Sequence, residues 1–320
     1  MEKLKHIEIN IGKACNNRCR FCMTAKSVLW NIKFVGIDIL KEKIKNYAEK
    51  GYNSIGFLGG DISIYPKLDE VMATCKNNGF VSVNIISNGM KFDDINFIEK
   101  LVKSGLTRIN ISIHSHLQII EDYLTQVEGG LDRKLKAIDN INLLYNRGLL
   151  ISPLSINIVL NQKNYKTIIE TVLFYRFKKG INDIRINFVW LNDDVREEWD
   201  GLKIMYTEVL LYFKKLIYLS NKYNIRITFD SIPPCIFYKI DKNNYKYNIK
   251  KFLGENQDHI DEIDDTSPDV VENFNWQDYK KNVLKIKYNK CKSCNYINNC
   301  QGIRKGYDEV YGDTEFTPIN

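Results

Sequence analysis

The feature that most constrains the fold of this chain is a short unit that recurs along its first 230 residues. Each unit is a helical pattern that ends in basic or polar residues and a glycine or asparagine, followed by a strand pattern. Glycine and asparagine adopt the left-handed conformation that ends a helix, and cationic side chains suit the helix C-terminus. Together with one strand before the first unit, the expected strands begin near His6, Ser54, Val81, Arg108, Ile156, Ile184 and Ile225.

Strands that alternate with helices at this spacing predict a parallel β-sheet with right-handed crossovers. The six strands between His6 and Val189 predict an α/β fold, a partial (β/α)6 TIM-like barrel that occupies residues 1–230. Functional groups in such barrels gather at the carboxyl ends of the strands. Residues 231–320 carry a separate group of cysteines and are expected to form a small C-terminal extension.

Composition narrows the class of protein. With 320 residues and 44% hydrophobic residues, the chain can bury a sizeable core, and it has no apolar run of about 18 residues that would cross a membrane. No signal segment precedes the first strand, which predicts a cytoplasmic protein whose eight cysteines are metal ligands or reduced thiols. The net charge of +7 is spread over scattered lysines, so nucleic-acid binding is not expected.

Three cysteines on a polar loop directly follow the first expected strand. Three residues separate Cys15 from Cys19, and two separate Cys19 from Cys22. Three thiolates can hold three irons of a 4Fe–4S cluster and leave the fourth iron open to a small molecule. A zinc knuckle or three unrelated buried thiols are the alternative interpretations.

This cysteine spacing resembles the signature of the radical S-adenosylmethionine (SAM) enzymes, and Phe21 matches the aromatic residue before the third cysteine. The resemblance implies that the amino and carboxylate groups of SAM bind the open iron. Reductive cleavage of SAM would then yield methionine and a 5′-deoxyadenosyl radical that abstracts a hydrogen from the substrate. It also implies a reducing partner such as flavodoxin or ferredoxin.

The end of the second strand extends the resemblance. Gly59, Gly60 and Asp61 stand where the family has a glycine-glycine-acid motif that binds the SAM amino group. The acid here is one methylene shorter than the glutamate usual in the family. Two glycines would also let the backbone approach a ligand closely. The alternative is a tight turn with an N-capping aspartate.

Later strand ends supply further residues that the resemblance places around SAM. Asn88 lies in a serine-asparagine-glycine element similar to the threonine-asparagine-glycine element of the family. Ser112 and Asn161 match polar positions near the carboxylate, ribose or methionine part of SAM. His114 is expected either to face the substrate cavity or to be a structural histidine. No catalytic residue beyond the cluster ligands is predicted.

The remaining cysteines form a second group. Cys291, Cys294 and Cys300 are close in sequence, and Cys235 is the unassigned cysteine that could complete a set of four. Four thiolates would close a tetrahedral zinc site or ligate every iron of a second cluster. Cys75 lies in a helical pattern and is expected to be a packed free thiol.

The C-terminal cysteine run resembles the auxiliary-cluster extensions called twitch and SPASM domains. The resemblance implies one auxiliary 4Fe–4S cluster bound by the second cysteine group, with zinc as the alternative. An acidic stretch from Glu255 to Glu272 precedes this run. Such a stretch is usually a solvated loop, and the alternative is that it shapes the substrate entrance.

The resemblance indicates the reaction class better than the substrate. We expect a ribosomally synthesised peptide to be cross-linked, oxidised or epimerised. Because the chain starts directly on the first strand, the peptide would need a separate leader-recognition protein or direct capture by the barrel. The alternative is dehydrogenation or rearrangement of a small molecule in cofactor or antibiotic biosynthesis. A zinc-binding module without enzyme activity is a third interpretation.

Overall fold

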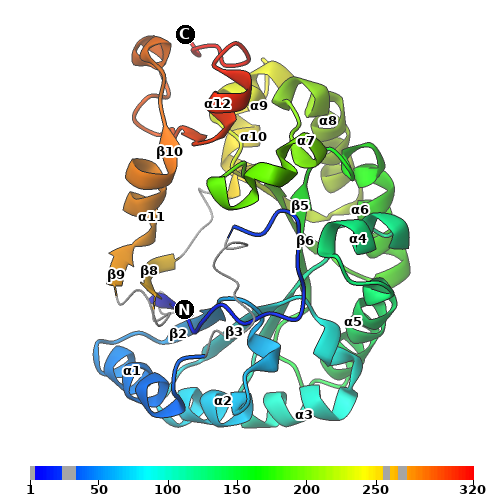
Figure 1. Ribbon diagram of the computed structural model, residues 1–320, viewed down its shortest axis with the longest axis vertical. Helices are drawn as coiled ribbons and strands as arrows, with labels where there is room; N and C mark the ends of the chain where they lie inside the picture. The colour runs from blue at the N-terminus through cyan, green and yellow to red at the C-terminus, as the bar shows by residue number, and fades with distance from the viewer. Residues whose placement is uncertain (1–3, 24–33, 255–259, 266–271) are drawn as a thin grey trace.

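A single open sheet organises the computed structural model, which describes residues 4–23, 34–254, 260–265 and 272–320 (Figure 1). The order of its strands is β7-β6-β5-β4-β3-β2-β1-β8-β9. The bounds are β1 His6–Asn10, β2 Ser54–Leu58, β3 Ser82–Ser87, β4 Arg108–Ser112, β5 Ser155–Leu160, β6 Asp183–Phe188, β7 Arg226–Asp230, β8 Ile260–Asp265 and β9 Glu272–Asn275. The strands from β1 to β8 pair in parallel, and β9 pairs antiparallel with β8.

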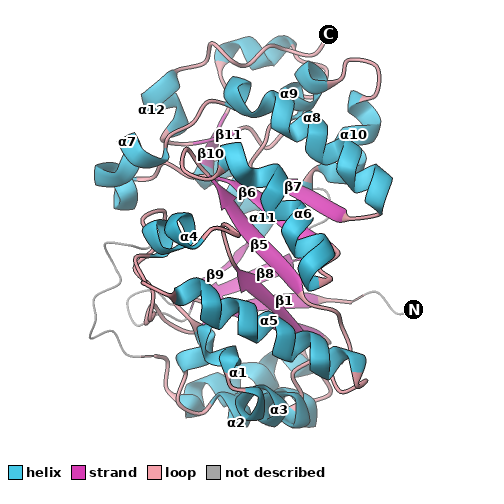
Figure 2. Cartoon of the chain, turned by 90° about the vertical axis from the view of Figure 1, so that its right-hand side faces the viewer, coloured by secondary structure: helices cyan, strands magenta, loops and turns pink. Residues whose placement is uncertain are grey.

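Helices cover the outer, convex face of this sheet (Figures 1 and 2). They are α1 Ile37–Glu49, α2 Leu68–Asn77, α3 Ile95–Ser104, α5 Gly130–Asn146, α6 Ile168–Lys179 and α8 Tyr206–Tyr223. Two shorter helices, α4 Gln118–Thr125 and α7 Trp199–Leu202, follow the carboxyl ends of β4 and β6. Short 3-10 turns follow several strands, namely η2 Ile62–Ile64, η3 Met90–Asp93, η4 Tyr165–Thr167 and η5 Asp193–Glu198.

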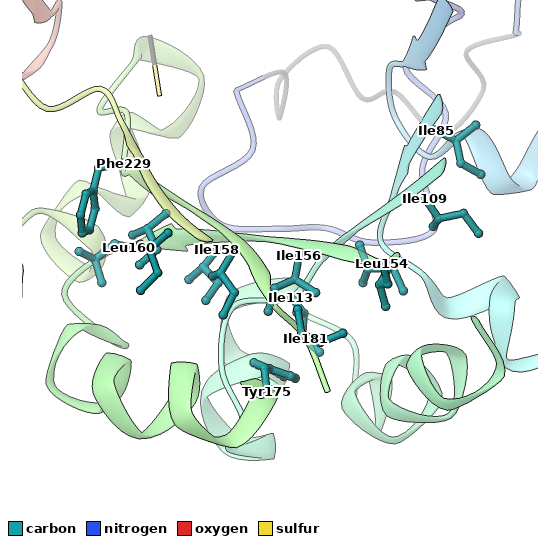
Figure 3. Close-up of a cluster of buried hydrophobic side chains, with 14 of the residues drawn as sticks. Ile85, Ile109, Ile113, Leu154, Ile156, Ile158, Leu160, Tyr175, Ile181 and Phe229 are labelled. Atoms are coloured by element: carbon teal, nitrogen blue, oxygen red, sulfur yellow. The ribbon is translucent and has the colours of Figure 1, made fainter. Parts of the chain in front are cut away.

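The strands alternate between apolar and polar residues, and this alternation explains why helices cover only one face of the sheet. In β4, Ile109 and Ile111 are fully buried, whereas the residues between and beside them are half-buried. Figure 3 shows outward-facing side chains of this kind, with Ile109 and Ile158 directed at the helices and Tyr175 contributed by α6. A parallel sheet covered on both faces would be apolar throughout. The inner, concave face is therefore left polar.

Most of the C-terminal region packs beside the carboxyl ends of β6 and β7 (Figure 2), whereas its helix α11, Trp276–Tyr279, lies next to β8 and β9 (Figure 1). The other helices of this region are α9 Pro234–Ile240, α10 Tyr245–Phe252 and α12 Tyr307–Tyr311, with the π-helix η7 Lys280–Leu284 and the 3-10 turn η8 Asn289–Ser293. Two short antiparallel strands, β10 Lys285–Ile286 and β11 Ile303–Arg304, form a separate ladder. A hydrogen bond of 2.7 Å from Arg304 Nε to Ser231 Oγ joins this ladder to the end of β7.

The expected α/β class with a partial barrel is confirmed, and all seven expected strands are present. The interpretation of the acidic stretch as a solvated loop is wrong for residues 260–265, because this segment is β8 and pairs with β1. Asp264 is 1% exposed, and its carboxylate accepts hydrogen bonds from Lys43 Nζ and Tyr47 OH, both at 2.8 Å. These partners compensate the charge that made the segment look like a loop. The acids at 255, 258 and 269 lie outside the described residues.

The C-terminal region and the barrel share one sheet, because β8 and β9 extend its β1 edge. The domain boundary expected at residue 230 remains a prediction. Within the described part of the chain, no helix has both the length and the hydropathy needed to cross a bilayer.

Candidate active site

The loop that carries the first three cysteines leaves the carboxyl end of β1 and is fastened to its neighbours. The backbone N–H of Arg20 donates to the Leu124 carbonyl of α4 at 2.9 Å. The Arg20 guanidinium donates to both carboxylate oxygens of Glu198, at 2.7 and 3.0 Å, and lies 4.4 Å from the Tyr123 ring centroid. Contacts with α4 and η5 therefore hold the loop in place.

The three thiols of this loop lie close enough to influence one another's charge. Burial raises the pKa of Cys15 to about 11 and that of Cys19 to about 12. The Asn17 backbone N–H donates to Cys15 Sγ at 3.4 Å, and Asn17 Nδ2 lies 3.9 Å from Cys19 Sγ. Thiols with such pKa values are protonated at neutral pH, so a metal centre that binds them must displace their protons.

The donor set fits an iron–sulfur cluster. It offers three thiols, two of which already have N–H groups directed at sulfur, an arrangement that stabilises cluster thiolates. In the described residues, no group of three or more His, Cys, Asp and Glu side chains is close enough together to hold one metal ion. A 4Fe–4S cluster instead binds each thiolate through a different iron atom.

The two glycines after β2 bring the backbone of that turn against the cysteine loop. The Gly60 N–H donates to the Gly12 carbonyl at 2.8 Å. A Cβ atom at Gly60 would collide with the Ala14 carbonyl, and one at Gly59, where φ is +144°, would collide with the Gly12 carbonyl. The close approach in this structure is therefore to the cysteine loop, and contact of these glycines with SAM remains a prediction.

Asp61 is fully buried, and its carboxylate is surrounded by hydrogen-bond donors. It accepts from the Ser63 N–H at 2.8 Å and from the Ser63 hydroxyl at 2.5 Å. It also accepts from the Ser87 hydroxyl and the Asn88 N–H, both at 2.9 Å. Asp61 is thus the N-cap of η2, as the alternative interpretation of the sequence has it, and it ties the turn after β2 to the turn after β3.

Asn88 joins the turn after β3 to the cysteine loop. Its Nδ2 donates to Asn16 Oδ1 at 2.6 Å and lies 4.0 Å from Cys15 Sγ. Its Oδ1 accepts from the Met90 N–H at 3.0 Å, which fixes the orientation of the amide. The structure therefore brings Asn88 to the same place as the first cysteine group.

A buried ion pair lies beneath this site and was missed from the sequence. Lys134 Nζ donates to Glu121 Oε1 at 2.6 Å and to the Ser112 carbonyl at 3.1 Å, and both charged side chains are at most 1% exposed. The second oxygen of Glu121 accepts from the N–H groups of His114 and Ser115, at 2.7 and 2.9 Å. The Lys134 charge also acts on Cys19, where it opposes the effect of burial on the thiol pKa.

His114 and Asn161 are both buried, and the side chain of each accepts a hydrogen bond from a backbone N–H group. His114 Nδ1 accepts from the Val159 N–H at 3.1 Å, which leaves the proton of the neutral ring on Nε2. Burial lowers the pKa of His114 to about 4, and the Phe21 ring packs edge-on against it with 4.5 Å between centroids. Asn161 Oδ1 accepts from the Lys163 N–H at 2.9 Å in the turn after β5. These contacts match the structural interpretation of His114.

The second group of cysteines also comes together in space. Cys235, at the start of α9, lines one pocket with Cys291, Cys294 and Cys300, and burial raises its pKa to about 12. Backbone N–H groups are directed at two of the sulfurs, from Gly302 to Cys300 and from Ile319 to Cys294, both at 3.3 Å. The fourth thiol that the sequence left unassigned thus lies with the other three, while Cys75 is buried among apolar residues of α2 and the core.

The element η5 connects the surroundings of the two cysteine groups. On one side Glu198 pairs with Arg20 of the first cysteine loop at 2.7 Å. On the other side Arg196 pairs with Glu309 of α12 at 2.9 Å. Both groups therefore lie at the carboxyl-end side of the sheet, where a barrel of this kind places its chemistry.

The family of the chain follows from a match of residues 9–175, more than half of its length, to the sequence model of the Radical SAM superfamily. The chain belongs to this superfamily, and it is a radical SAM enzyme. This confirms the resemblance drawn from the first cysteine group. The enzymes of the family use a 4Fe–4S cluster together with SAM.

Curated relatives of the chain are similar over different lengths. A probable GTP 3′,8-cyclase of Saccharolobus solfataricus is 29% identical over 186 residues, which are 57% of this chain and 56% of the relative. The chain thus spans little more than half the length of that relative. The GTP 3′,8-cyclase of Clostridium botulinum is 22% identical over 300 residues, which cover 82% of this chain and 89% of the relative.

Solved structures share the fold at low sequence identity. Streptococcus suis SuiB has a TM-score of 0.54 at 17% identity, over 71% of this chain and 49% of that protein. Native anSMEcpe with bound AdoMet and Cp18Cys peptide has a TM-score of 0.62 at 13% identity, over 98% of this chain and 93% of that one. The fold similarity to anSMEcpe therefore extends into the C-terminal region.

Proposed function

We propose that this radical SAM enzyme modifies a peptide and carries a second, fully ligated 4Fe–4S cluster in its C-terminal region. The observation that supports the proposal best is the convergence of Cys235 with Cys291, Cys294 and Cys300 on one pocket. Four thiolates give every iron of a 4Fe–4S cluster a protein ligand. A substrate would then find no open iron at this cluster and would be held by the protein itself.

The inner face of the sheet offers the surface on which such a substrate would lie. Polar side chains from neighbouring strands bond to one another across it: half-buried Asn110 donates from Nδ2 to Oγ of the buried Ser155 at 2.9 Å, and Asn187 Nδ2 donates to Asn157 Oδ1 at 2.5 Å. An extended peptide carries one backbone donor and one acceptor at nearly every residue. A polar surface that crosses several strands can pair with many of these groups.

In the proposed centre, Cys15, Cys19 and Cys22 ligate the first cluster. When bound, that cluster and SAM supply the 5′-deoxyadenosyl radical that removes a hydrogen from the substrate. The residues that we assign to the SAM site are Phe21, Gly59, Gly60, Asp61, Asn88, Ser112 and Asn161. Because four donors already occupy the Asp61 carboxylate, we propose that Asp61 positions the two turns, and that backbone carbonyls of the glycine turn accept from the SAM ammonium.

The partners of the reaction are part of the same proposal. Reduced flavodoxin or ferredoxin would supply the electron, and a separate leader-recognition protein would deliver the peptide where the barrel does not capture it directly. A cytoplasmic location, where thiols stay reduced, remains the prediction from the sequence.

The curated relatives favour a second candidate, a radical SAM enzyme that acts on a small molecule. Both relatives described above are named as GTP 3′,8-cyclases, so a purine nucleotide is the first small molecule to test. The two candidates share the first cluster and differ in what occupies the inner face.

The deciding experiment measures 5′-deoxyadenosine from anaerobically reconstituted, reduced protein. The wild type should form it from SAM, and the Cys15/Cys19/Cys22 triple alanine variant should not. Adding GTP or a set of precursor peptides then distinguishes the candidates, because substrate increases the yield and deuterated substrate transfers deuterium to 5′-deoxyadenosine. A wild type that forms no 5′-deoxyadenosine and binds zinc with little iron would overturn both.

A further inference from the structure

A short segment from Glu315 to Ile319 runs from the barrel to the auxiliary cysteines, and we call it the covering segment. Glu315, Phe316 and Ile319 are buried, although the segment belongs to no helix or strand. Buried backbone and polar groups outside secondary structure need other hydrogen-bond partners. The partners of this segment lie at both of its ends and connect two parts of the molecule.

The first end of the covering segment is fixed to the barrel. Glu315 Oε1 accepts a hydrogen bond from the Thr207 N–H at 2.7 Å, and Oε2 accepts from the Tyr206 N–H at 3.2 Å. These are the first two N–H groups of α8, which have no partner within the helix. The helix dipole also favours a carboxylate at this position. Glu315 therefore anchors the segment at the start of α8.

The middle of the covering segment forms one wall of the auxiliary pocket. Phe316, Thr317 and Pro318 line that pocket together with the four cysteines. The ring of Phe316 also packs against Tyr206 and Tyr307, with 5.7 Å between ring centroids in both pairs. Aromatic pairs at this separation add to the stability that burial provides. Packing with α8 and α12 therefore holds this wall in place.

The second end of the covering segment reaches a thiol. The Ile319 N–H donates to Cys294 Sγ at 3.3 Å, and the Ile319 carbonyl accepts from the Asn295 N–H at 2.8 Å. Bonds on both sides thus fix the direction of the Ile319 N–H. This donor is 25 residues from its thiol in the chain, whereas the Gly302 N–H comes only two residues after Cys300. The bond to Cys294 therefore depends on the path of the covering segment.

An N–H group in this position would act on the charge of a bound cluster. Reduction adds one electron to a 4Fe–4S cluster, and part of the added negative charge resides on the thiolate sulfurs. A donor stabilises the reduced form more than the oxidised form, so it raises the reduction potential. The effect is strongest where water is excluded. Most of the other residues that line this pocket are apolar, among them Pro233, Ile286 and Ile303.

We propose that the covering segment closes the auxiliary site to water and that the Ile319 N–H raises the reduction potential of the cluster bound there. Glu315 and Phe316 position the segment, and Ile319 acts on the cluster through Cys294. The inference rests on the proposed function in one respect, since it takes the four cysteines to bind a 4Fe–4S cluster. It depends neither on the identity of the substrate nor on SAM cleavage.

Two substitutions at one position test the role of the Ile319 N–H. Ile319→Pro removes the N–H and keeps the carbonyl that accepts from Asn295, whereas the matched control Ile319→Val keeps both. Both are made in the Cys15/Cys19/Cys22 triple alanine background, so that the auxiliary cluster is the one that remains. The potential is measured by redox titration followed by electron paramagnetic resonance, on anaerobically reconstituted protein without SAM.

The expected result is a lower potential in Ile319→Pro than in Ile319→Val, because the reduced cluster loses a donor. At a fixed potential, the ratio of reduced to oxidised cluster should fall about tenfold, which is a shift of about 59 mV for one electron. Both variants should bind about four irons per chain, as one 4Fe–4S cluster requires.

Hydrogen–deuterium exchange of the reconstituted wild type tests whether the segment stays in place over the site. The N–H groups of Phe316 and Ile319 are hydrogen-bonded and buried. Within the peptide that covers residues 315–320, these two should exchange at least about tenfold more slowly than in an unstructured chain. This measurement needs no substitution, and it decides where Ile319→Pro fails to fold or to bind iron.

The same potential in Ile319→Pro and Ile319→Val, with about four irons in each, would overturn this inference and leave the auxiliary cluster of the proposed function intact. Exchange of the segment at the rate of an unstructured chain would overturn it as well. Zinc in place of iron, found by elemental analysis, would overturn the auxiliary cluster and this inference with it. Formation of 5′-deoxyadenosine by the wild type is measured separately and reports on the first cluster.

Discussion

The carboxylate of Asp61 accepts a hydrogen bond from the Asn88 N–H at 2.9 Å and thereby joins the turn after β2 to the turn after β3. Asn88 in turn bonds to Asn16 of the first cysteine loop at 2.6 Å. Three loops at the carboxyl edge of the sheet thus share one network, and Asp61 is its buried centre. A residue in this position influences a bound cofactor through the loops that it holds.

Asp61→Asn should destabilise the protein, because the amide that replaces one carboxylate oxygen would face donors. We expect the free energy of unfolding to fall by about 1–3 kcal/mol, as for other buried groups that lose their partners. The matched control is Asp94→Asn, which changes an exposed N-cap of α3 and should cost less. Thermal unfolding compares the variants, and calorimetry with SAM is run beside it. Unchanged stability with weakened SAM binding would instead indicate direct contact between Asp61 and SAM.

The residues that could be predicted from the sequence are those whose signal is local. Glycine after a helix and alternating isoleucines along a strand identify each unit without knowledge of its neighbours. The spacing of Cys15, Cys19 and Cys22 is equally local. Cys235 could be predicted as well. Of the eight cysteines, only Cys75 and Cys235 lie outside the two sequence clusters, and Cys75 lies in a helical pattern, so Cys235 was left to complete the second group.

The features that sequence reasoning missed depend on contacts between distant segments. The burial of Asp264 requires Lys43 of α1, which is far from β8 in the chain. Lys134 looked like one of many helix-surface lysines, although it lies on the same helix stripe as the buried Leu131 and Ile138. That stripe was the available sequence signal for the burial of Lys134. Glu121, the partner of Lys134, could be recognised only from the packing of α4 beside α5.

Cys235→Ala tests whether the fourth thiol belongs to the auxiliary site. The wild type should bind about eight irons per chain, as two 4Fe–4S clusters require, and the variant should approach about four because the second cluster loses a ligand. The control is Cys75→Ala, which removes a fully buried thiol outside both groups and should keep the wild-type iron content. Iron and zinc are measured together by elemental analysis. A wild type with about four irons and one zinc would contradict the auxiliary cluster.

Lys134→Met should be among the most destabilising substitutions in the barrel. It leaves the Glu121 carboxylate buried and uncompensated, and removing one partner of a buried pair costs about 3–5 kcal/mol. Arg133→Gln, at the neighbouring position, breaks an exposed pair with Asp93 and should cost less than about 1 kcal/mol. Chemical denaturation provides both values. The double variant Lys134→Met/Glu121→Gln should recover part of the loss, and similar costs for the two single variants would refute the assignment.

The buried His114 should make the stability of the protein depend on pH. Its pKa is lowered to about 4 in the folded state, whereas an unfolded histidine titrates near its ordinary value of 6.5. Between these values the unfolded chain binds more protons, so its free energy falls relative to the native state as the pH decreases. The stability contributed by neutral His114 is therefore complete above pH 6.5, and about 2 kcal/mol of it is lost by pH 5.

Denaturant unfolding of the wild type and of His114→Asn at several values from pH 7 to pH 5 measures this effect. The Asn side chain offers an acceptor oxygen to the Val159 N–H in place of Nδ1, so the variant should keep the fold and lose most of the pH dependence. His116→Asn is the comparison, because His116 is only half-buried and should contribute a smaller slope. The same slope in the wild type and in His114→Asn would show that the pKa of His114 does not differ between the folded and unfolded states, which would contradict its burial as a neutral ring.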